Sequence, residues 1–252
     1  PNHVISDSKN HHPGIDNSGP FLSMNPFSSR CCQHNHGFGW PYYTENLLYA
    51  TPDNGIAAVL YNACKAKVKV GDGTEVTLQE QTNYPFEENI RFTLTTPESV
   101  TFPLYLRIPS WCKNASVSVN GQKLNASLIP GKYAKITREW SEADEVVLTV
   151  PMDFNYRQWQ VNKNSVSVDY GPHTLSLKID EDYQQKDSRE TAIGDSKWQE
   201  GADASAWPTY EIYPASPWNY ALQVAAPITV QRKEWPFDNN PFTLTNVPLE
   251  FK

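Results

Sequence analysis

The chain has 252 residues, of which 39% are hydrophobic and 12% aromatic, and its formal net charge is −7. This length and composition can supply one large globular domain or two modest ones. The negative charge excludes binding of nucleic acid through a basic surface, and no apolar run is long enough to span a membrane.

The first 37 residues are polar and show no sustained periodicity, so we expect a loop. They include neither an initiator methionine nor the apolar segment of a signal peptide, and we expect the chain to be a C-terminal piece of a longer protein. A helix is predicted over residues 38–50 by apolar residues at intervals of three and four. These residues are Trp40, Tyr43, Leu47 and Ala50. Pro41 suits the first turn of that helix, which places Cys31 and Cys32 in a loop just before it.

From residue 56 onward, short segments of alternating apolar and polar residues are separated by turn residues. That pattern predicts an antiparallel β-sandwich over residues 56–155. Asn120-Gly121 suits a tight hairpin turn, and Pro103, which cannot donate a ladder hydrogen bond, predicts an edge strand or a bulge. Residues 180–206 are polar and acidic and predict a long loop, after which aromatic-rich segments predict further strands.

Four cysteines in a chain of this length do not make a disulfide framework. Cys64 and Cys112 are isolated in apolar, strand-like segments, and we expect them to be buried thiols. Cys31 and Cys32 allow three interpretations: a strained vicinal disulfide, two unrelated buried thiols, or part of a zinc site completed outside this chain. The histidines two and four residues after Cys32 are possible nitrogen ligands for such a site.

The stretch RCCQHNHGFGWPYYTENLLYATPDNGIAAVLYNA and the later segments FPLYLRIPSWCKNASVSVNGQ and SVDYGPHTLSLKI resemble the β-L-arabinofuranosidase family, glycoside hydrolase family 127. The resemblance covers nearly the entire chain, and its most specific parts are Cys-Cys-x-x-Asn and the LRIPSWC…VNG strand pair. It implies an (α/α)6 barrel as catalytic domain, followed by β-sandwich domains. We therefore expect residues 1–52 to be the end of that barrel, 53–155 a β-sandwich, and 156–252 a second β-rich region.

The resemblance also implies a metal and a mechanism. The first cysteine of the family's pair is the nucleophile of a retaining glycosidase, and both cysteines bind zinc together with a glutamate and a further cysteine from upstream. By position, Cys31 is then the nucleophile and a zinc ligand, and Cys32 is a zinc ligand. The acid/base glutamate and the other two ligands lie upstream in the family, so we expect this chain alone to be inactive.

Three further residues are candidates for substrate contact or for support of the cysteine pair. Asn35 matches the family's motif and is expected to brace the loop, and His34 is expected to donate a hydrogen bond to the pair or to the substrate. Trp218 is a candidate for stacking on a sugar, with an ordinary packing role as its alternative. Glu45 and Glu211 do not match the family's acid/base motif, and we assign neither of them to catalysis.

The predicted function is the C-terminal part of a retaining glycoside hydrolase that acts on furanosidic or related sugars of plant polysaccharide. Two alternatives stay open: a non-catalytic β-sandwich module that binds carbohydrate or supports a barrel, and a free-standing zinc-structural protein, which the shortage of ligands disfavours. The sequence CCQHN differs from the Cys-Cys-Pro-x-Asn form of other members, which leaves the identity of the sugar open.

The expected partners are an oligosaccharide or glycoside and the upstream barrel, with a homodimer as a further option and neither nucleic acid nor a membrane. A periplasmic or secreted bacterial protein is favoured over a cytoplasmic one, because polysaccharide-degrading enzymes are commonly exported.

Overall fold

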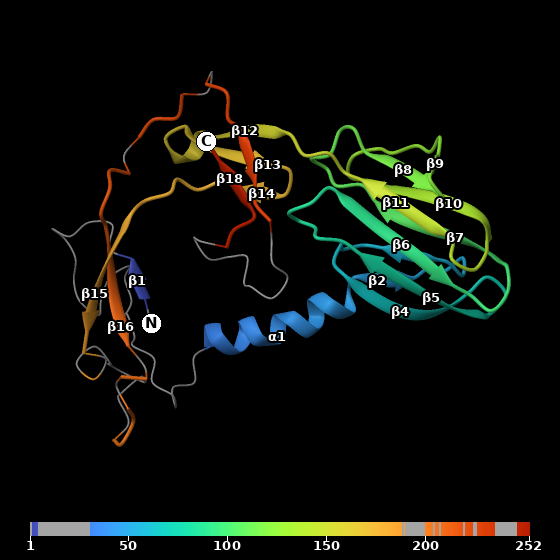
Figure 1. Ribbon diagram of the computed structural model, residues 1–252, viewed down its shortest axis with the longest axis horizontal. Helices are drawn as coiled ribbons and strands as arrows, with labels where there is room; N and C mark the ends of the chain where they lie inside the picture. The colour runs from blue at the N-terminus through green and yellow to red at the C-terminus, as the bar shows by residue number, and fades with distance from the viewer. Residues whose placement is uncertain are drawn as a thin grey trace. The chain divides into compact units, whose positions relative to one another are not determined.

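The computed structural model describes residues 2–4, 31–187, 189, 200–203, 205–206, 208–218, 220–223, 226–234 and 246–252. The chain forms two compact units. One consists of Pro1–Trp40 and Ser176–Leu222, and the other consists of Pro41–Leu175 and Gln223–Lys252. Figure 1 shows the strands of both units in chain order by colour.

A β-sandwich makes up most of the second unit (Figure 1). Its four-stranded sheet has the order β10-β7-β3-β2 and consists of β2 (Leu48–Ala50), β3 (Ile56–Ala58), β7 (Val100–Arg107) and β10 (Tyr133–Trp140). Its six-stranded sheet has the order β4-β5-β6-β11-β8-β9 and consists of β4 (Cys64–Val70), β5 (Thr74–Gln81), β6 (Asn89–Thr95), β8 (Ser116–Val119), β9 (Gln122–Lys123) and β11 (Glu145–Thr149). Every pair is antiparallel except β3 with β7. The predicted antiparallel β-sandwich is confirmed.

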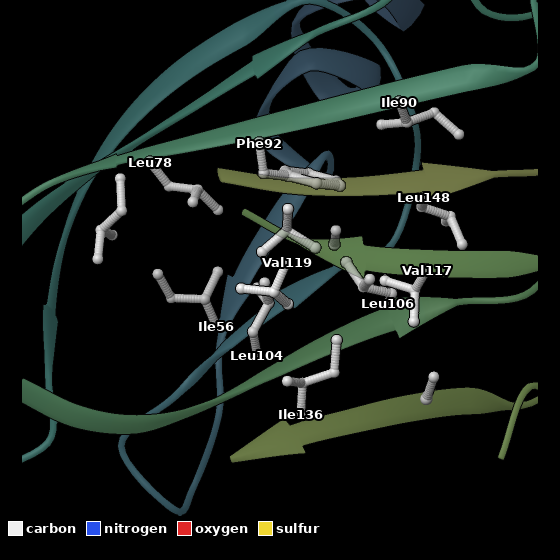
Figure 2. Close-up of a cluster of buried hydrophobic side chains, with 14 of the residues drawn as sticks. Ile56, Leu78, Ile90, Phe92, Leu104, Leu106, Val117, Val119, Ile136 and Leu148 are labelled. Carbon is white, nitrogen blue, oxygen red and sulfur yellow. The ribbon is translucent and has the colours of Figure 1, made fainter. Parts of the chain in front are cut away.

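Alternate residues of the two sheets meet in one apolar core, which Figure 2 shows between the strands. The alternation that predicts the strands therefore also selects the core residues, since successive side chains of a strand point to opposite faces. Among the described residues Trp140 is the largest fully buried side chain, and its indole N–H donates to the carbonyl oxygen of Phe102 at 2.9 Å. The polar end of this side chain is thus satisfied inside the core.

Two local predictions in the sandwich have different outcomes. Asn120 and Gly121 both have positive φ, 50° and 75°, between β8 and β9, which confirms the tight hairpin turn. The prediction for Pro103 holds only locally, because β7 as a whole lies between β10 and β3 and pairs with β10 in an unbroken register, whereas Pro103 itself has no partner in β3. The proline is accommodated because β3 pairs only with Leu104, Tyr105 and Leu106, so its ladder with β7 begins one residue after Pro103.

The rest of the second unit adds a small β-rich region with its own apolar cluster. Its elements are β12 (Phe154–Trp159), the 3-10 helix η2 (Gln160–Asn162), β13 (Ser165–Tyr170), β14 (His173–Thr174), β17 (Val230–Arg232) and β18 (Leu249–Phe251). The buried members of the cluster are Phe86, Met152, Tyr170 and Leu249. Arg232 also donates to the carbonyl oxygen of Phe86 at 2.9 Å, which ties β17 to the loop before β6.

The first unit contains a three-stranded sheet of order β1-β16-β15, made of β1 (Asn2–Val4), β15 (Glu181–Lys186) and β16 (Thr209–Pro214). β15 occupies the start of the segment 180–206, for which the sequence predicts a loop. Its polar residues give little alternation, and antiparallel pairing with β16 makes it a strand. Residues 188, 190–199 and 204 of that segment lie outside the described residues.

Helix α1 spans Cys31–Glu45, so it begins and ends earlier than the predicted helix over 38–50. Pro41 lies in its interior, and Leu48–Ala50 is the first strand of the sandwich. The apolar spacing is misleading because its last members belong to the strand region: the carbonyl oxygen of Leu47 accepts the backbone N–H of Val59 at 2.9 Å. Whether α1 is the last helix of a barrel stays a prediction, as does the division at residues 52 and 155.

Candidate functional site

The cysteine pair forms the first two residues of α1 and does not lie in a loop before it. The side chains of Cys31, Cys32 and His34 lie outside the described residues, and their predicted roles stay predictions.

The second and third turns of α1 carry polar and aromatic side chains that face solvent. Asn35 and His36 are exposed, and Trp40 has 56% of its surface accessible. The indole N–H of Trp40 donates to Nε2 of His36 at 3.3 Å, and the two rings meet edge to face with centroids 5.8 Å apart. The apolar spacing that includes Trp40 predicts a buried position on one helix face, with stacking on a sugar as the alternative. The exposure of Trp40 shows that the buried position is wrong, and the alternative stays a prediction.

The two glutamates that sequence reasoning left unassigned have different surroundings. Glu45 is the exposed last residue of α1. Glu211 is buried in β16, where it forms an ion pair with Lys186 at 3.1 Å and accepts the hydroxyl of Tyr213 at 2.8 Å. A buried carboxylate with these partners is well suited to holding β15 on β16.

Trp218 follows β16 and has 49% of its surface accessible. An exposed indole of this kind can stack on a sugar ring. The side chains of the cysteine pair lie outside the described residues, so the predicted role of Trp218 stays a prediction.

The sandwich contains a buried carboxyl group whose burial the sequence does not predict. Glu80 of β5 has 1% of its surface accessible; it accepts the backbone N–H of Asn62 at 3.0 Å and the thiol of Cys64 at 3.9 Å. Burial raises the pKa of Glu80 to about 8. A perturbed carboxyl is a common mark of a catalytic acid, but this one is enclosed and out of reach of a glycosidic bond.

The surroundings of the two remaining cysteines do not favour the thiolate form that a nucleophile needs. Cys112 is fully buried, as predicted, but it lies in the loop before β8 and not in a strand. Cys64 lies in a strand, β4, as predicted, but it is only half-buried. Burial, together with the nearby Glu80 carboxyl, raises the pKa of Cys64 to about 11, so its thiol stays protonated at neutral pH. Neither residue is a second candidate for the nucleophile.

The cysteine pair is the predicted source of donor atoms for a metal. Within the part of the chain whose side chains the structure describes, no three His, Cys, Asp or Glu residues are grouped as metal ligands; the pair itself lies outside that part. Two thiolates fit zinc by chemistry and supply half of a four-coordinate shell. Across the described residues, no helix has the length and apolarity needed to cross a membrane.

A second polar group that the sequence does not reveal lies on the outer face of the four-stranded sheet. Asp53 accepts hydrogen bonds from the hydroxyl of Tyr105 at 2.6 Å and from Nζ of Lys135 at 3.0 Å. The two donors come from paired positions of β7 and β10. Their outward direction can be predicted from alternation, whereas their meeting at one carboxylate depends on strand pairing that the sequence does not show.

Comparisons with known proteins find similarity to one family of glycoside hydrolases. Residues 55–152 match the family model "Beta-L-arabinofuranosidase, GH127 middle domain". A solved GH127 beta-L-arabinofuranosidase from Geobacillus stearothermophilus T6 is 26% identical with a TM-score of 0.53, and the match covers 62% of this chain and 28% of that one. A second solved structure, a glycoside hydrolase, is 28% identical with a TM-score of 0.58, and the match covers 68% and 28%.

A third solved structure, a GH127 beta-arabinofuranosidase, is 22% identical with a TM-score of 0.51 and supports the fold alone; the match covers 66% of this chain and 32% of that one. The aligned part thus spans about a third or less of each of these three proteins. No curated protein matches the sequence.

Proposed function

Because the chain carries the middle domain of glycoside hydrolase family 127 over residues 55–152, we propose that it is part of a retaining glycoside hydrolase whose active site includes Cys31 and Cys32. The family match carries this proposal, since the matched domain follows the cysteine pair and α1 in the order that the family resemblance implies. The solved relative named as a beta-L-arabinofuranosidase supports a furanoside as the substrate class. A plant polysaccharide as the source of that furanoside is part of the proposal.

The proposed reaction has two displacements at the anomeric carbon. The Cys31 thiolate attacks that carbon, and the new C–S bond forms while the bond to the leaving oxygen breaks and a glutamate protonates that oxygen. Water then attacks the same carbon and gives its proton to the glutamate as the C–S bond breaks. Two inversions give net retention, with sulfur in place of the usual carboxylate nucleophile. The glutamate is the one that the family resemblance places upstream.

Cys31 and Cys32 are the residues of this chain that would hold zinc. When bound, zinc would keep both thiols deprotonated near neutral pH. The other two ligands, a glutamate and a cysteine, would come from the barrel that the resemblance implies.

The proposed substrate contacts are His34, Asn35 and Trp218. Asn35 is exposed on α1, and the exposed ring of Trp218 offers an apolar surface to a sugar. The proposed partners are therefore a glycoside or oligosaccharide and the catalytic barrel.

Hydrolysis of aryl glycosides tests the proposal. We expect a longer protein that includes the barrel to release nitrophenol from an aryl β-L-arabinofuranoside or a related furanoside, and the 252-residue chain alone to release none. Cys31→Ser should lower kcat in the longer protein by about 10³-fold or more, as expected for loss of a nucleophile. Cys64→Ser is the matched control, because its protonated thiol has no place in the mechanism, and it should leave kcat unchanged.

The second candidate function is a non-catalytic β-sandwich module. It is favoured by the fact that the matched family model is that of the middle domain. It predicts that the longer protein hydrolyses none of the glycosides and that Cys31→Ser changes no measured property. Full activity of Cys31→Ser in an active longer protein would instead contradict the thiolate mechanism.

A further inference from the structure

One row of side chains crosses the outer face of the four-stranded sheet, with one residue from each strand. The register places Tyr49 of β2 opposite Ala57 of β3, Ala57 opposite Tyr105 of β7, and Tyr105 opposite Lys135 of β10. Directly paired residues point to the same face of a sheet. Since neighbouring strands are about 4.8 Å apart, the two tyrosines stand roughly 10 Å apart with only a methyl group between them.

The ring of Tyr105 is held in place from one side of this row. Its hydroxyl donates to Oδ2 of Asp53 at 2.6 Å, and Nζ of Lys135 lies 5.2 Å from the ring centroid. Asp53 also accepts the hydroxyl of Thr51 at 2.6 Å. The hydrogen bonds from Thr51 and Tyr105 hold the pKa of Asp53 well below its usual range, so it is a charged acceptor. A ring and a carboxylate fixed in advance lose little freedom when a ligand binds.

The composition of this face fits a sugar better than a protein. The outward residues of β7 and β10 are Thr101, Pro103, Tyr105, Arg107, Tyr133, Lys135, Thr137 and Glu139. Pro103 is buried, and the others carry hydroxyls, charges or aromatic rings and no large aliphatic group. The centre of a stable protein interface is more apolar than this and poor in charged residues. Tyrosine rings beside polar groups match the C–H faces and hydroxyls of a carbohydrate.

A groove continues the row beyond β10. It has a volume of about 940 Å³ and lies between β10 and the segment 124–129, with Tyr133, Lys135 and Ile129 among its lining residues. Lys135 belongs to both the row and the groove. An extended ligand that lies across β2, β3 and β7 would therefore reach a concave surface at the edge of the sheet.

We propose that this row and groove form a carbohydrate-binding site for a neutral, hydroxyl-rich oligosaccharide chain. Sugar rings stack on Tyr49 and Tyr105 across the gap at Ala57, and their hydroxyls bond to Asp53 and Lys135. This goes beyond the proposed hydrolysis, because the site binds polysaccharide without any part in bond cleavage.

Affinity electrophoresis of the 252-residue chain in native gels that contain soluble arabinan or arabinoxylan tests the proposal. At least one of these polysaccharides should retard the chain. Tyr49→Ala removes a ring, and Ala57→Leu fills the gap while both rings stay; each should weaken binding about tenfold, or about 1.4 kcal/mol. Tyr156→Ala is the matched control: Tyr156 is an exposed tyrosine of β12, outside the row, and this variant should migrate like the unmodified chain.

Two results would overturn the proposal. One is no retardation by either polysaccharide, and the other is binding by Tyr49→Ala equal to that of the unmodified chain. In the second case, a change of oligomeric state in Tyr49→Ala by sedimentation would assign this face to contact between copies of the chain. Tyr49 is 46% exposed, so Tyr49→Ala should leave the fold intact. The proposal can therefore still be tested with Tyr49→Ala if Ala57→Leu unfolds. Cys31→Ser should bind sugar normally, which separates this test from that of the hydrolase.

Discussion

The carboxyl group of Glu80, a residue with 1% of its surface accessible, accepts the backbone N–H of Asn62 in a 3.0 Å hydrogen bond. A charged carboxylate needs more partners than this N–H and the distant thiol of Cys64 at 3.9 Å. Burial accordingly raises the pKa of Glu80 to about 8, and the group is mostly protonated at neutral pH. The sandwich therefore contains a buried acid whose ionisation opposes folding.

The pH dependence of stability follows from this shift. The folded state keeps the proton up to a pH of about 8, whereas the unfolded chain releases it near 4.5. The free energy of unfolding should thus fall between these values, by at most about 1.4 kcal/mol per pH unit from this group. Glu80→Gln keeps the shape of the side chain and cannot ionise. The free energy of unfolding of this variant, measured in urea, should therefore rise relative to that of the unmodified chain from pH 5 to pH 8. Parallel pH profiles for the two proteins would contradict this account.

Trp140→Phe tests the hydrogen bond inside the core. The substitution removes the indole donor and leaves the buried carbonyl oxygen of Phe102 without it, which should cost about 1–3 kcal/mol in the free energy of unfolding. Trp159→Phe is the control: this indole is 44% exposed, and its loss should change stability by less than about 0.5 kcal/mol. Equal effects of the two substitutions in denaturant titrations would refute the role given to Trp140.

Gly55→Ala tests the close approach that accompanies Pro103. A Cβ on Gly55 would lie 2.1 Å from the carbonyl oxygen of Pro103, so the backbone of the loop before β3 must move. We expect a loss of about 2 kcal/mol or more, measured by thermal or urea unfolding. Gly37→Ala in α1 is the control, because no atom lies within 4 Å of its added Cβ. That variant should be neutral or more stable by up to about 1 kcal/mol, since alanine favours a helix.

The sandwich could be predicted from the sequence because the alternation of apolar and polar residues identifies both the strands and the face that each strand buries. In β7, for example, Leu104 and Leu106 are buried, whereas Tyr105 and Arg107 are not. The helix could not be placed from spacing, because Leu47 continues the apolar interval of α1 although it lies beyond the helix. Neither the burial of Glu80 nor the row at Ala57 could be predicted, since both depend on which strands pair and in what register.

The proposed chemistry rests on zinc bound by the cysteine pair, and zinc content per chain tests it most directly. Elemental analysis should find about one zinc in a longer protein that includes the barrel and none in the 252-residue chain, which supplies half of the shell. Cys31→Ser and Cys32→Ser should each reduce that zinc content, and Cys64→Ser should not. Absence of zinc from the longer protein, or zinc content unchanged by both substitutions of the pair, would contradict the thiolate mechanism.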